Sequence, residues 1–397
     1  MKTLPQIIAV TSLNLRAIAQ RRGNSLVIVL GTAGVVAVMV AVLSMTSGFL
    51  RTMSAGGEQD RVVLQTRGAY SEGMSSLSRE NVKSIELAPG IRKGADGKAL
   101  VSAELVTLMP VIRKSDGEDA FVNLRGIEPQ GFALRPELRL IAGRLPRSGV
   151  REVVVGAAAQ KQFAGLEPGD EVRSGDGDWT VVGVFQSGGS AYESTLIADA
   201  EAMLSAYRLT TFNTVIVRLA SADSFDVFRD AITAIPGLTV DVQREPDYLA
   251  AASEPFRKLL NLVACALGGI MAVGALFGAL NTMYSAVSMR SAEIATLRAI
   301  GFGGSAVVTS VFVEALLLAL LGAAIGVLLV YVGFDGRTIS TVGNYIGNSP
   351  QIVYSLSISP HLALIGILFA CGVGLLGGLF PAVRAARLPV AAALRAK

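Results

Sequence analysis

Four long apolar runs interrupt an otherwise mixed sequence, and each is long enough to cross a lipid bilayer. Residues 23–50 and 259–289 carry no charged side chain, residues 299–334 carry only Glu314, and a further uncharged tract runs from Thr338 to Val383. A helix rises about 1.5 Å per residue, so about 20 apolar residues cross a hydrocarbon core of about 30 Å. The pattern predicts membrane-spanning helices near residues 26–47, 259–283, 306–333 and 361–381.

The segments that flank these runs also carry structural signals. The tract TISTVGNYIGNSPQIVYSLSISP, from Thr338, is too polar and too rich in Gly, Asn and Pro to span, and it indicates an external loop. Residues 1–22 combine apolar positions on one face with several arginines, which predicts an amphipathic helix that lies along the inner headgroups and braces the first span. A cleaved signal peptide is the competing interpretation. The apolar run is too long for one, and no small-x-small cleavage pattern follows it.

The long segment between the first two spans, residues 51–255, is large enough to form its own hydrophobic core. Strand-like runs begin at residues 61 (RVVLQT), 100 (LVSAELVTLM), 121 (FVNLRGI), 152 (EVVVG), 179 (WTVVGVF) and 213 (NTVIVRL). Helix-like runs are SRENVKSIEL, with a cap expected at Ser78, GAAAQKQFAG from 156, and DSFDVFRDAITAI from 223, with a cap expected near Ser221 or Asp223. GDGD at 175–178 indicates a hairpin turn. We expect an external α+β domain in two lobes.

Composition supports a membrane protein and argues against several other classes. Only 17% of the residues are charged and 51% are hydrophobic, whereas soluble domains have about 25% charged residues. The external segment holds 22 basic and 28 acidic side chains, and the rest of the chain holds 13 and 3. The basic excess lies beside apolar runs, which indicates membrane lipid and not nucleic acid as a partner. Cys265 and Cys371 lie inside apolar runs, which argues against a disulfide scaffold or a zinc site.

Basic residues in the short flanks predict the orientation of the spans. The N-terminal tail has Lys2, Arg16, Arg21 and Arg22, the loop after the second span has Arg290 and Arg298, and the C-terminal tail has Arg384, Arg387, Arg395 and Lys397. The loop after the third span has only Arg337. We therefore expect both termini and residues 284–305 to be cytoplasmic, and residues 48–257 to be external.

The sequence contains no catalytic constellation that we recognise. His361 is the only histidine and lies at an expected membrane boundary, so a hydrolase triad has no base to use. The nearest approach to a phosphate loop, residues 94–99, lacks the required first Gly and the Ser/Thr after Lys. Loop carboxylates such as Asp116, Glu118 and Asp119 are interpreted as solvent-exposed side chains and not as ligands of a cation. We expect no enzyme activity, metal or cofactor on this chain.

The segment between the second and third spans has the pattern of a short amphipathic helix over residues 285–303. Ile294, Leu297 and Ile300 recur at a spacing of three, and Arg290 and Glu293 lie one turn apart on a polar face. Glycines at 301, 303 and 304 then break the helix. Such a helix, tied to two spans, suits a lever that another protein can grip. The alternative is an ordinary interfacial helix on the headgroups.

This segment resembles the signature of FtsX/MacB-type ABC-transporter permeases. The matching residues are Asn281, Arg290, Glu293, Ile294, Leu297, Arg298, Ala299, Ile300, Gly301 and Glu314. The ending PAVRAARLPVAAALRA (Pro381 to Ala396) resembles the family's C-terminus, in which a Pro closes the fourth span, and residues 143–185 are similar to the family's periplasmic core domain. Two positions depart from the pattern: Ala295, where Gly is common, and Met289, where charged residues are common.

The resemblance implies a multi-pass permease of the bacterial inner membrane. Residues 51–255 would form the periplasmic core domain, and residues 256–397 an FtsX-like permease domain with a coupling helix at 285–303 and a basic tail. An ABC ATPase dimer, which binds ATP and Mg, would push this coupling helix. The full MacB type carries its ATPase before the first span, where this chain has a 22-residue tail, so we expect the ATPase on a separate chain. A second permease chain, identical or not, is implied.

The resemblance leaves several functions open. The leading hypothesis is export of a periplasmic or outer-leaflet substrate by transmitted motion, with a periplasmic adaptor protein as a further candidate partner. Lipoprotein release is the alternative, because LSMTSGF at 43–49 is similar to the end of the first span in lipoprotein-releasing permeases. A cell-division FtsX-like regulator is a weaker alternative, because members of that branch have a smaller external domain than residues 51–255. A membrane receptor or adhesin without an ATPase is a further alternative, and it predicts no partner protein at the loop between the second and third spans.

The polar and small residues inside the spans also have competing interpretations. A charge at mid-bilayer costs at least about 2.5–3.5 kcal/mol, so Glu314 must be partnered, protonated or near the boundary. We favour a structural role for it over a direct role in coupling, and we place Asn281 with it as an intramembrane polar residue. Three glycine pairs, 274/278, 322/326 and 374/378, permit close helix packing, either inside the bundle or at a dimer seam.

Overall fold

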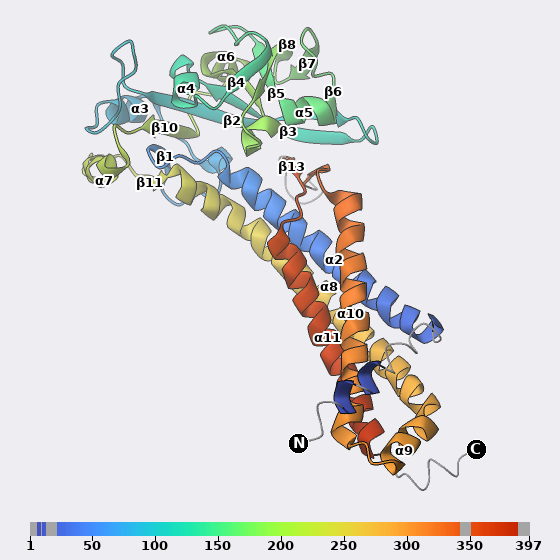
Figure 1. The fold of residues 1–397 in the computed structure, drawn as a ribbon. Coiled ribbons are helices and arrows are strands. Elements are labelled where there is room, and N and C mark those ends of the chain that lie inside the picture. Colours follow the sequence, from blue (N-terminus) through green and yellow to red (C-terminus); the bar gives the residue numbers. More distant parts are fainter. Residues whose placement is uncertain (1–5, 9, 13–21, 342–350, 388–397) are drawn as a thin grey trace. The chain divides into compact units, whose positions relative to one another are not determined.

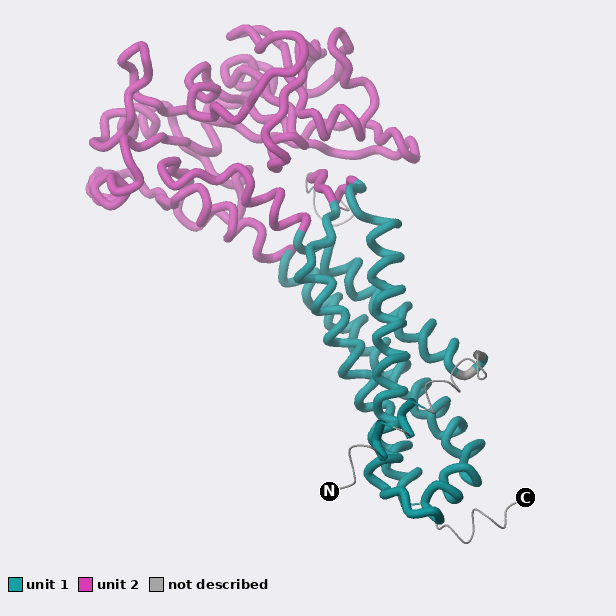
Figure 2. Tube along the Cα trace, in the orientation of Figure 1, with its two compact units in different colours: residues 1–47, 257–337, 356–397 teal, residues 48–256, 338–355 magenta. Residues whose placement is uncertain are grey.

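The computed structural model describes residues 6–8, 10–12, 22–341 and 351–387, and it divides into two compact units (Figure 2). We call residues 1–47, 257–337 and 356–397 the helical unit. We call residues 48–256 and 338–355 the sheet unit. Two helices contribute to both units, because the boundary at 47/48 lies within α2 (Arg22–Ser54) and the boundary at 256/257 lies within α8 (Glu245–Met289).

In the part of the chain that the structure describes, four helices have the length and apolar character to cross a membrane, which confirms the expected four spans (Figure 1). They are α2, α8, α10 (Gly304–Phe334) and α11 (Pro360–Arg387). α8 begins well before the span expected near 259–283, and it continues through Pro255. The predicted span began at residue 259, after the charged residues Arg257 and Lys258. The helix itself begins earlier, because helical hydrogen bonding does not require apolar side chains.

The end of α11 differs from the expectation that Pro381 closes the fourth span. The helix continues past Pro381 to Arg387. Transmembrane helices tolerate proline where neighbouring groups satisfy the backbone. Here the residues that follow include Ala382 and Ala385, which are fully buried in the helical unit's apolar cluster. The remainder of the expected basic tail, residues 388–397, lies outside the described residues.

The described part of the N-terminal tail is helical and contacts the region where α10 begins. The backbone N–H of Gly303 donates to Oε1 of Gln6 at 3.4 Å, and the hydroxyl of Ser310 donates to the carbonyl of Val10 at 3.5 Å. Val10 is buried. The bracing of the first span that we predicted for this tail rests on residues 13–21, which lie outside the described residues.

The sheet unit is built on one mixed sheet of 11 strands. Most neighbours are antiparallel, whereas β3 pairs with β9 and β5 with β8 in parallel. The main path runs β11-β1-β10-β2-β3-β9-β5-β8-β4, with β6 beside β2 and β7 beside β8. The strands are β1 (Arg61–Thr66), β2 (Val101–Arg113), β3 (Asp119–Ile127), β4 (Arg139–Gly143), β5 (Glu152–Gly156), β6 (Phe163–Ala164), β7 (Glu171–Ser174), β8 (Gly177–Gln186), β9 (Leu196–Asp199), β10 (Thr214–Arg218) and β11 (Val240–Arg244).

Short helices connect these strands. α3 begins after Ser78, and its predicted cap is confirmed by a reciprocal capping box with Asn81. α7 begins later than expected: Ser221 precedes a 3₁₀ turn, and Ser224 precedes the α-helix itself. The helical elements are η1 (Glu72–Met74), α3 (Arg79–Glu86), α4 (Pro129–Leu134), α5 (Ala157–Gln162), η2 (Ala191–Ser194), α6 (Ala200–Ala206), η3 (Ala222–Ser224) and α7 (Phe225–Thr233).

The two lobes that we expected share this single sheet, because β2 is long enough to belong to both. Residues 101–104 of β2 pair with β10, and residues 105–112 pair with β3. The alternating pattern predicted the strand but not its pairing with two different neighbours. The lobes are therefore joined by continuous backbone.

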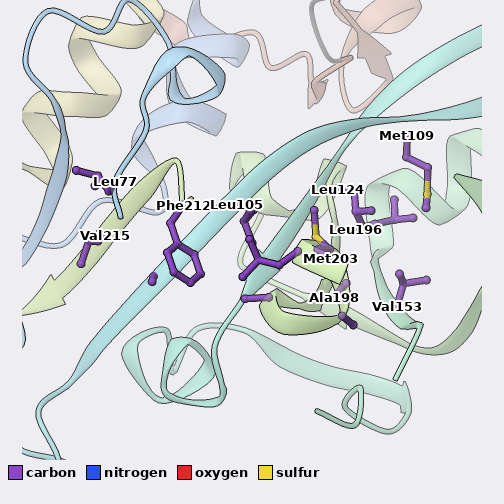
Figure 3. Close-up of a cluster of buried hydrophobic side chains, with 14 of the residues drawn as sticks. Leu77, Leu105, Met109, Leu124, Val153, Leu196, Ala198, Met203, Phe212 and Val215 are labelled. Atoms are coloured by element: carbon purple, nitrogen blue, oxygen red, sulfur yellow. The ribbon is translucent and has the colours of Figure 1, made fainter. Parts of the chain in front are cut away.

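The core of the sheet unit lies on the sheet and under the short helices (Figure 3). It draws from both ends of the strand order, since Val215 of β10 and Val153 of β5 belong to the same cluster. The labelled side chains also include Leu105, Leu124, Leu196 and Met203, all with almost no exposed surface. The β-branched and aliphatic runs seen in the sequence are thus the residues that the fold buries.

The loop between the third and fourth spans belongs to the sheet unit. Its two short strands, β12 (Thr338–Ser340) and β13 (Val353–Ser355), pair with each other. The hydroxyl of Ser194 donates to the carbonyl of Val353 at 3.2 Å and accepts from its N–H at 2.8 Å. The loop that we predicted to be external therefore shares a compact unit with the domain that we predicted to be external.

Candidate coupling site

The chain turns twice between α8 and α10, and α9 (Ser291–Ala299) lies between the turns. Arg290, at φ −102° and ψ 9°, leaves the helical conformation. Gly301, at φ +99°, makes the second turn in the left-handed region that glycine adopts without a Cβ clash. The helix that we expected over 285–303 is thus shorter, because its first residues still belong to α8.

An ion pair fixes the first of these turns. Nη1 of Arg290 lies 2.9 Å from Oε2 of Glu314 on α10, and the two side chains are only 5% and 6% exposed. Removing one ion of such a pair is strongly destabilising, because the other ion stays buried without a counter-charge. The start of α9 is therefore fastened to α10.

This contact corrects the position that we assigned to Arg290 and answers the question about Glu314. Arg290 does not lie on an exposed polar face with Glu293: Arg290 is buried, whereas Glu293 is exposed. Glu314 is partnered, by the basic residue that borders the second span. Glu314 is the only charged residue between residues 299 and 334, so its need for a basic partner was the available signal for the pair.

The apolar spacing of three along α9 does not form one buried face. Ile294 is buried in the cluster that contains Met283 and Val311, and Leu297 is half-buried. Ile300 is 68% exposed, because α9 ends at Ala299 and the next residue leaves the helical register. Arg298, in the last turn, is half-buried and favourably placed for the helix dipole.

A cavity of about 310 Å³ lies beside the ion pair, inside the helical unit. Its lining combines the charged groups Arg290, Glu293 and Glu314 with apolar side chains. Leu297 belongs to the same lining, so a change at this residue alters both α9 and the cavity. The site thus offers an exposed helix, one acidic side chain on its surface and a partly apolar recess.

Two family models match this chain, and together they cover most of it. The model described as MacB-like periplasmic core domain matches residues 24–235, which include α2 and most of the sheet unit. The model described as FtsX-like permease C-terminal matches residues 266–390, which include the coupling site. The chain belongs to the FtsX/MacB-type ABC-transporter permeases.

Several relatives of this permease have been named. The macrolide export ATP-binding/permease protein MacB of Campylobacter jejuni is 24% identical over 83% of this chain and 56% of its own length. The ABC transporter permease YtrF of Bacillus subtilis is 26% identical over 43% of this chain and 41% of its own. The periplasmic region of MacB from Actinobacillus actinomycetemcomitans aligns with a TM-score of 0.38 and 16% identity, over 50% of this chain and 94% of that one. The permease spans about half the length of the MacB relatives it matches.

The glycine pairs of the permease have different surroundings. A Cβ at Gly322 would lie 2.7 Å from the carbonyl oxygen of Val29 on α2, and one at Gly374 would lie 2.6 Å from Cβ of Ala319 on α10. Those two pairs pack inside the bundle. At Gly274 and Gly278 of α8 a Cβ would meet no described atom within 4 Å.

Asn281 lies on the same face of α8, one turn beyond Gly278, and it is exposed. The most apolar window of α8 is only 11% buried, against 33–39% in the other three long helices of the permease. Sequence reasoning left the role of the glycine pairs open. In the structure, the pairs 322/326 and 374/378 pack against neighbouring helices of the bundle. The pair 274/278 lies on a face of α8 that the described residues leave uncovered.

Proposed function

We propose that this permease transmits motion from an ABC ATPase to its periplasmic domain. The observation that carries the proposal is the buried ion pair between Arg290 and Glu314. A push on α9 would be absorbed by bending if the turn at Arg290 were loose. Because the turn is fastened to α10, the push reaches a membrane span.

The proposed partner at α9 is an ABC ATPase dimer on a separate chain, which binds ATP and Mg. The exposed Glu293 and Ile300 and the half-buried Leu297 offer it one acidic and two apolar contacts. The distribution of basic residues in the short flanks supports a cytoplasmic position for α9 and both termini. In this arrangement the ATPase subunits and the periplasmic domain lie on opposite sides of the inner membrane.

A second permease chain is the proposed partner for α8. Gly274, Gly278 and Asn281 form a face that permits close approach and offers a side-chain hydrogen bond in lipid. The low burial of α8 supports a contact there with another chain. The partner is either a second copy of this chain or a different permease chain, and the mass of the purified assembly distinguishes the two.

The proposed activity is export of a periplasmic or outer-leaflet substrate, with a periplasmic adaptor as a further partner. The names of the MacB relatives support export over lipoprotein release, without identifying the cargo.

Co-purification with the ABC ATPase encoded nearest to this gene tests the proposal. The double variant Glu293→Gln/Leu297→Ala removes the acidic contact and one apolar contact of α9. We expect at least a tenfold loss of bound ATPase, or hydrolysis that no longer responds to the permease, while the sheet unit stays folded by circular dichroism. Mass measurement of the assembly reports whether one or two kinds of permease chain are present.

The matched control is Asp335→Asn/Leu329→Ala. It makes the same kinds of change near the other end of α10, where both side chains are exposed. We expect this control to bind and stimulate the ATPase as the unaltered chain does. Equal ATPase binding and coupling in the two double variants would rule out α9 as the point of contact.

A further inference from the structure

A buried charge network in the sheet unit leaves one buried carboxylate oxygen without a hydrogen-bond partner among the described residues. The network begins at Arg61, which is fully buried on β1. Its Nε donates to Oε2 of Glu245 at 2.6 Å, and its Nη1 donates to Oε1 of Glu137 at 2.5 Å. The backbone N–H of Glu58 also donates to Oε2 of Glu245, at 3.1 Å.

The rest of the network surrounds Glu104, which is fully buried on β2. Arg125 donates to it at 2.8 Å, and Arg135 donates at 2.7 and 3.0 Å. Arg125 also pairs with Glu72. Burial opposes ionisation of Glu104, but Arg135 and Arg125 outweigh it and hold the pKa of Glu104 below its ordinary value. This part of the network is ionised and internally paired.

The network carries more carboxylates than guanidinium groups. Its three guanidinium groups are paired with four carboxylates, those of Glu72, Glu104, Glu137 and Glu245. The carboxylate that is incompletely paired is that of Glu245, which is 1% exposed. Its Oε1 is buried and has no hydrogen-bond partner among the residues the structure describes. A buried acceptor without a donor is costly, so this oxygen is a place where a ligand's donor would be stabilised.

Glu245 lines a cavity of about 160 Å³. Much of the remaining wall is apolar, and it includes Val63, Ile216 and Leu249. Apolar cavities of about 150 Å³ bind benzene-sized molecules. The cavity therefore combines room for one small apolar group with the buried carboxylate of Glu245 in its wall.

The charges around the cavity favour a cation over an anion. Arg125 also lines it, but this guanidinium group already has Glu72 and Glu104 as partners, so it offers an incoming anion little unused charge. The ring of Tyr192, another lining residue, presents a π face that attracts cations, as its contacts with Arg125 and Arg135 show.

We propose that this cavity binds a small apolar amine in its protonated form, with the ammonium group donating to Oε1 of Glu245. The apolar body then lies against Val63, Ile216 and Leu249. Met53 of α2 and Tyr248 of α8 also line the cavity, so a ligand touches both helices that continue from the sheet unit into spans. The site stands independently of the proposed coupling to an ATPase.

Three probes of equal size but different charge test the proposal: benzylamine, benzyl alcohol and benzoate. Binding to the full chain in phosphatidylcholine nanodiscs is measured by saturation-transfer NMR and calorimetry, with empty nanodiscs as the blank. No ATP or ATPase is present, so the result is separate from the test of coupling. We expect saturable binding in the order benzylamine, benzyl alcohol, benzoate.

Glu245→Gln should weaken benzylamine binding about tenfold or more, because a charge-assisted hydrogen bond becomes a neutral one. It should change benzyl alcohol binding much less. The matched control is Glu137→Gln, which removes a carboxylate from the same Arg61 but does not line the cavity, and we expect a change within about twofold. Should Glu245→Gln fail to fold, Leu249→Phe fills the cavity without changing charge, and it should abolish binding of benzylamine and benzyl alcohol alike.

Three outcomes would overturn the proposal. One is the absence of saturable binding above empty nanodiscs for benzylamine. Another is benzoate binding that equals benzylamine binding. The third is benzylamine affinity that is unchanged in both Glu245→Gln and Leu249→Phe.

Discussion

Removing one charge of the pair between Arg290 and Glu314 should loosen the turn between α8 and α9. In Glu314→Gln, Arg290 keeps its charge and its burial but loses the carboxylate 2.9 Å away. Breaking a buried pair in this way costs about 3–5 kcal/mol. Because about 1.4 kcal/mol corresponds to a factor of ten, the open form of the turn should become about 100-fold more populated or more.

Hydrogen exchange of the α9 amides, measured by mass spectrometry on the chain in nanodiscs, reports this population. The N–H of Ile294 donates to the carbonyl of Arg290 at 2.9 Å, so its exchange requires the turn to open. We expect about 100-fold faster exchange in Glu314→Gln and in Arg290→Met. The double variant Arg290→Met/Glu314→Leu removes both charges together and should recover most of the protection, because no ion is left unpaired.

Glu293→Gln is the matched control, since it makes the same chemical change on the exposed side of α9. Exposed charge interactions contribute about 1 kcal/mol at most, so we expect less than about a fivefold change. The reasoning is refuted if Glu314→Gln exchanges no faster than Glu293→Gln. It is equally refuted if the double variant loses as much protection as the two single variants combined.

Three further predictions concern other parts of the permease. Gly322→Ala should destabilise the bundle by about 1–3 kcal/mol, because the added Cβ would overlap the backbone of α2, and thermal melting should show a drop of several degrees. In Gly278→Ala the added Cβ meets no described atom within 4 Å, so the variant should melt normally, and if α8 forms the proposed contact with a second permease chain, cross-linking there should weaken. Hydrogen bonds from Arg144 lower the pKa of Glu152 to about 2, so that interaction stabilises the sheet unit above pH about 4.5 and is lost as pH falls toward 2. Arg144→Gln should therefore lower the melting temperature by a few degrees at pH 7, with the difference from the unaltered chain shrinking below pH 4; a difference that is constant with pH would contradict this.

The sequence predicted the features that depend on local patterns. Scarcity of charge over a bilayer's length identified the spans α2, α8, α10 and α11, and apolar strand-like runs identified β1, β2, β3, β5, β8 and β10. The capping box at Ser78 and the turn at 175–178 also follow from neighbouring residues alone. Each of these signals is complete within a few positions of the chain.

The features that sequence reasoning missed depend on residues far apart in the chain. β9 (LIAD) and β11 (VDVQR) hold only one and two β-branched residues, and the sheet stabilises them by pairing them with β3, β5 and β1. Glu245 falls within the external segment 51–255 of the sequence, yet it begins α8 and its side chain is buried and bonded to Arg61.

The extent of α9 was missed for a related reason. The apolar spacing predicts one helix over residues 285–303. It contains no sign that the backbone at Arg290 is not helical, or that this side chain pairs with Glu314 on another helix. The same contact removes Arg290 from the polar face on which the pattern had placed it. Spacing along a sequence predicts which side chains share a face only while the backbone stays regular.

The length of β2 has a mechanical consequence for the periplasmic domain. A tensile load applied to one half of the sheet is carried to the other half along covalent bonds, and not across a deformable interface between separate bodies. A hinge at this point would have to bend the backbone of β2 itself between Glu104 and Leu105, where its pairing passes from β10 to β3. The two lobes should consequently be displaced together when the domain moves, because one strand is shared between them.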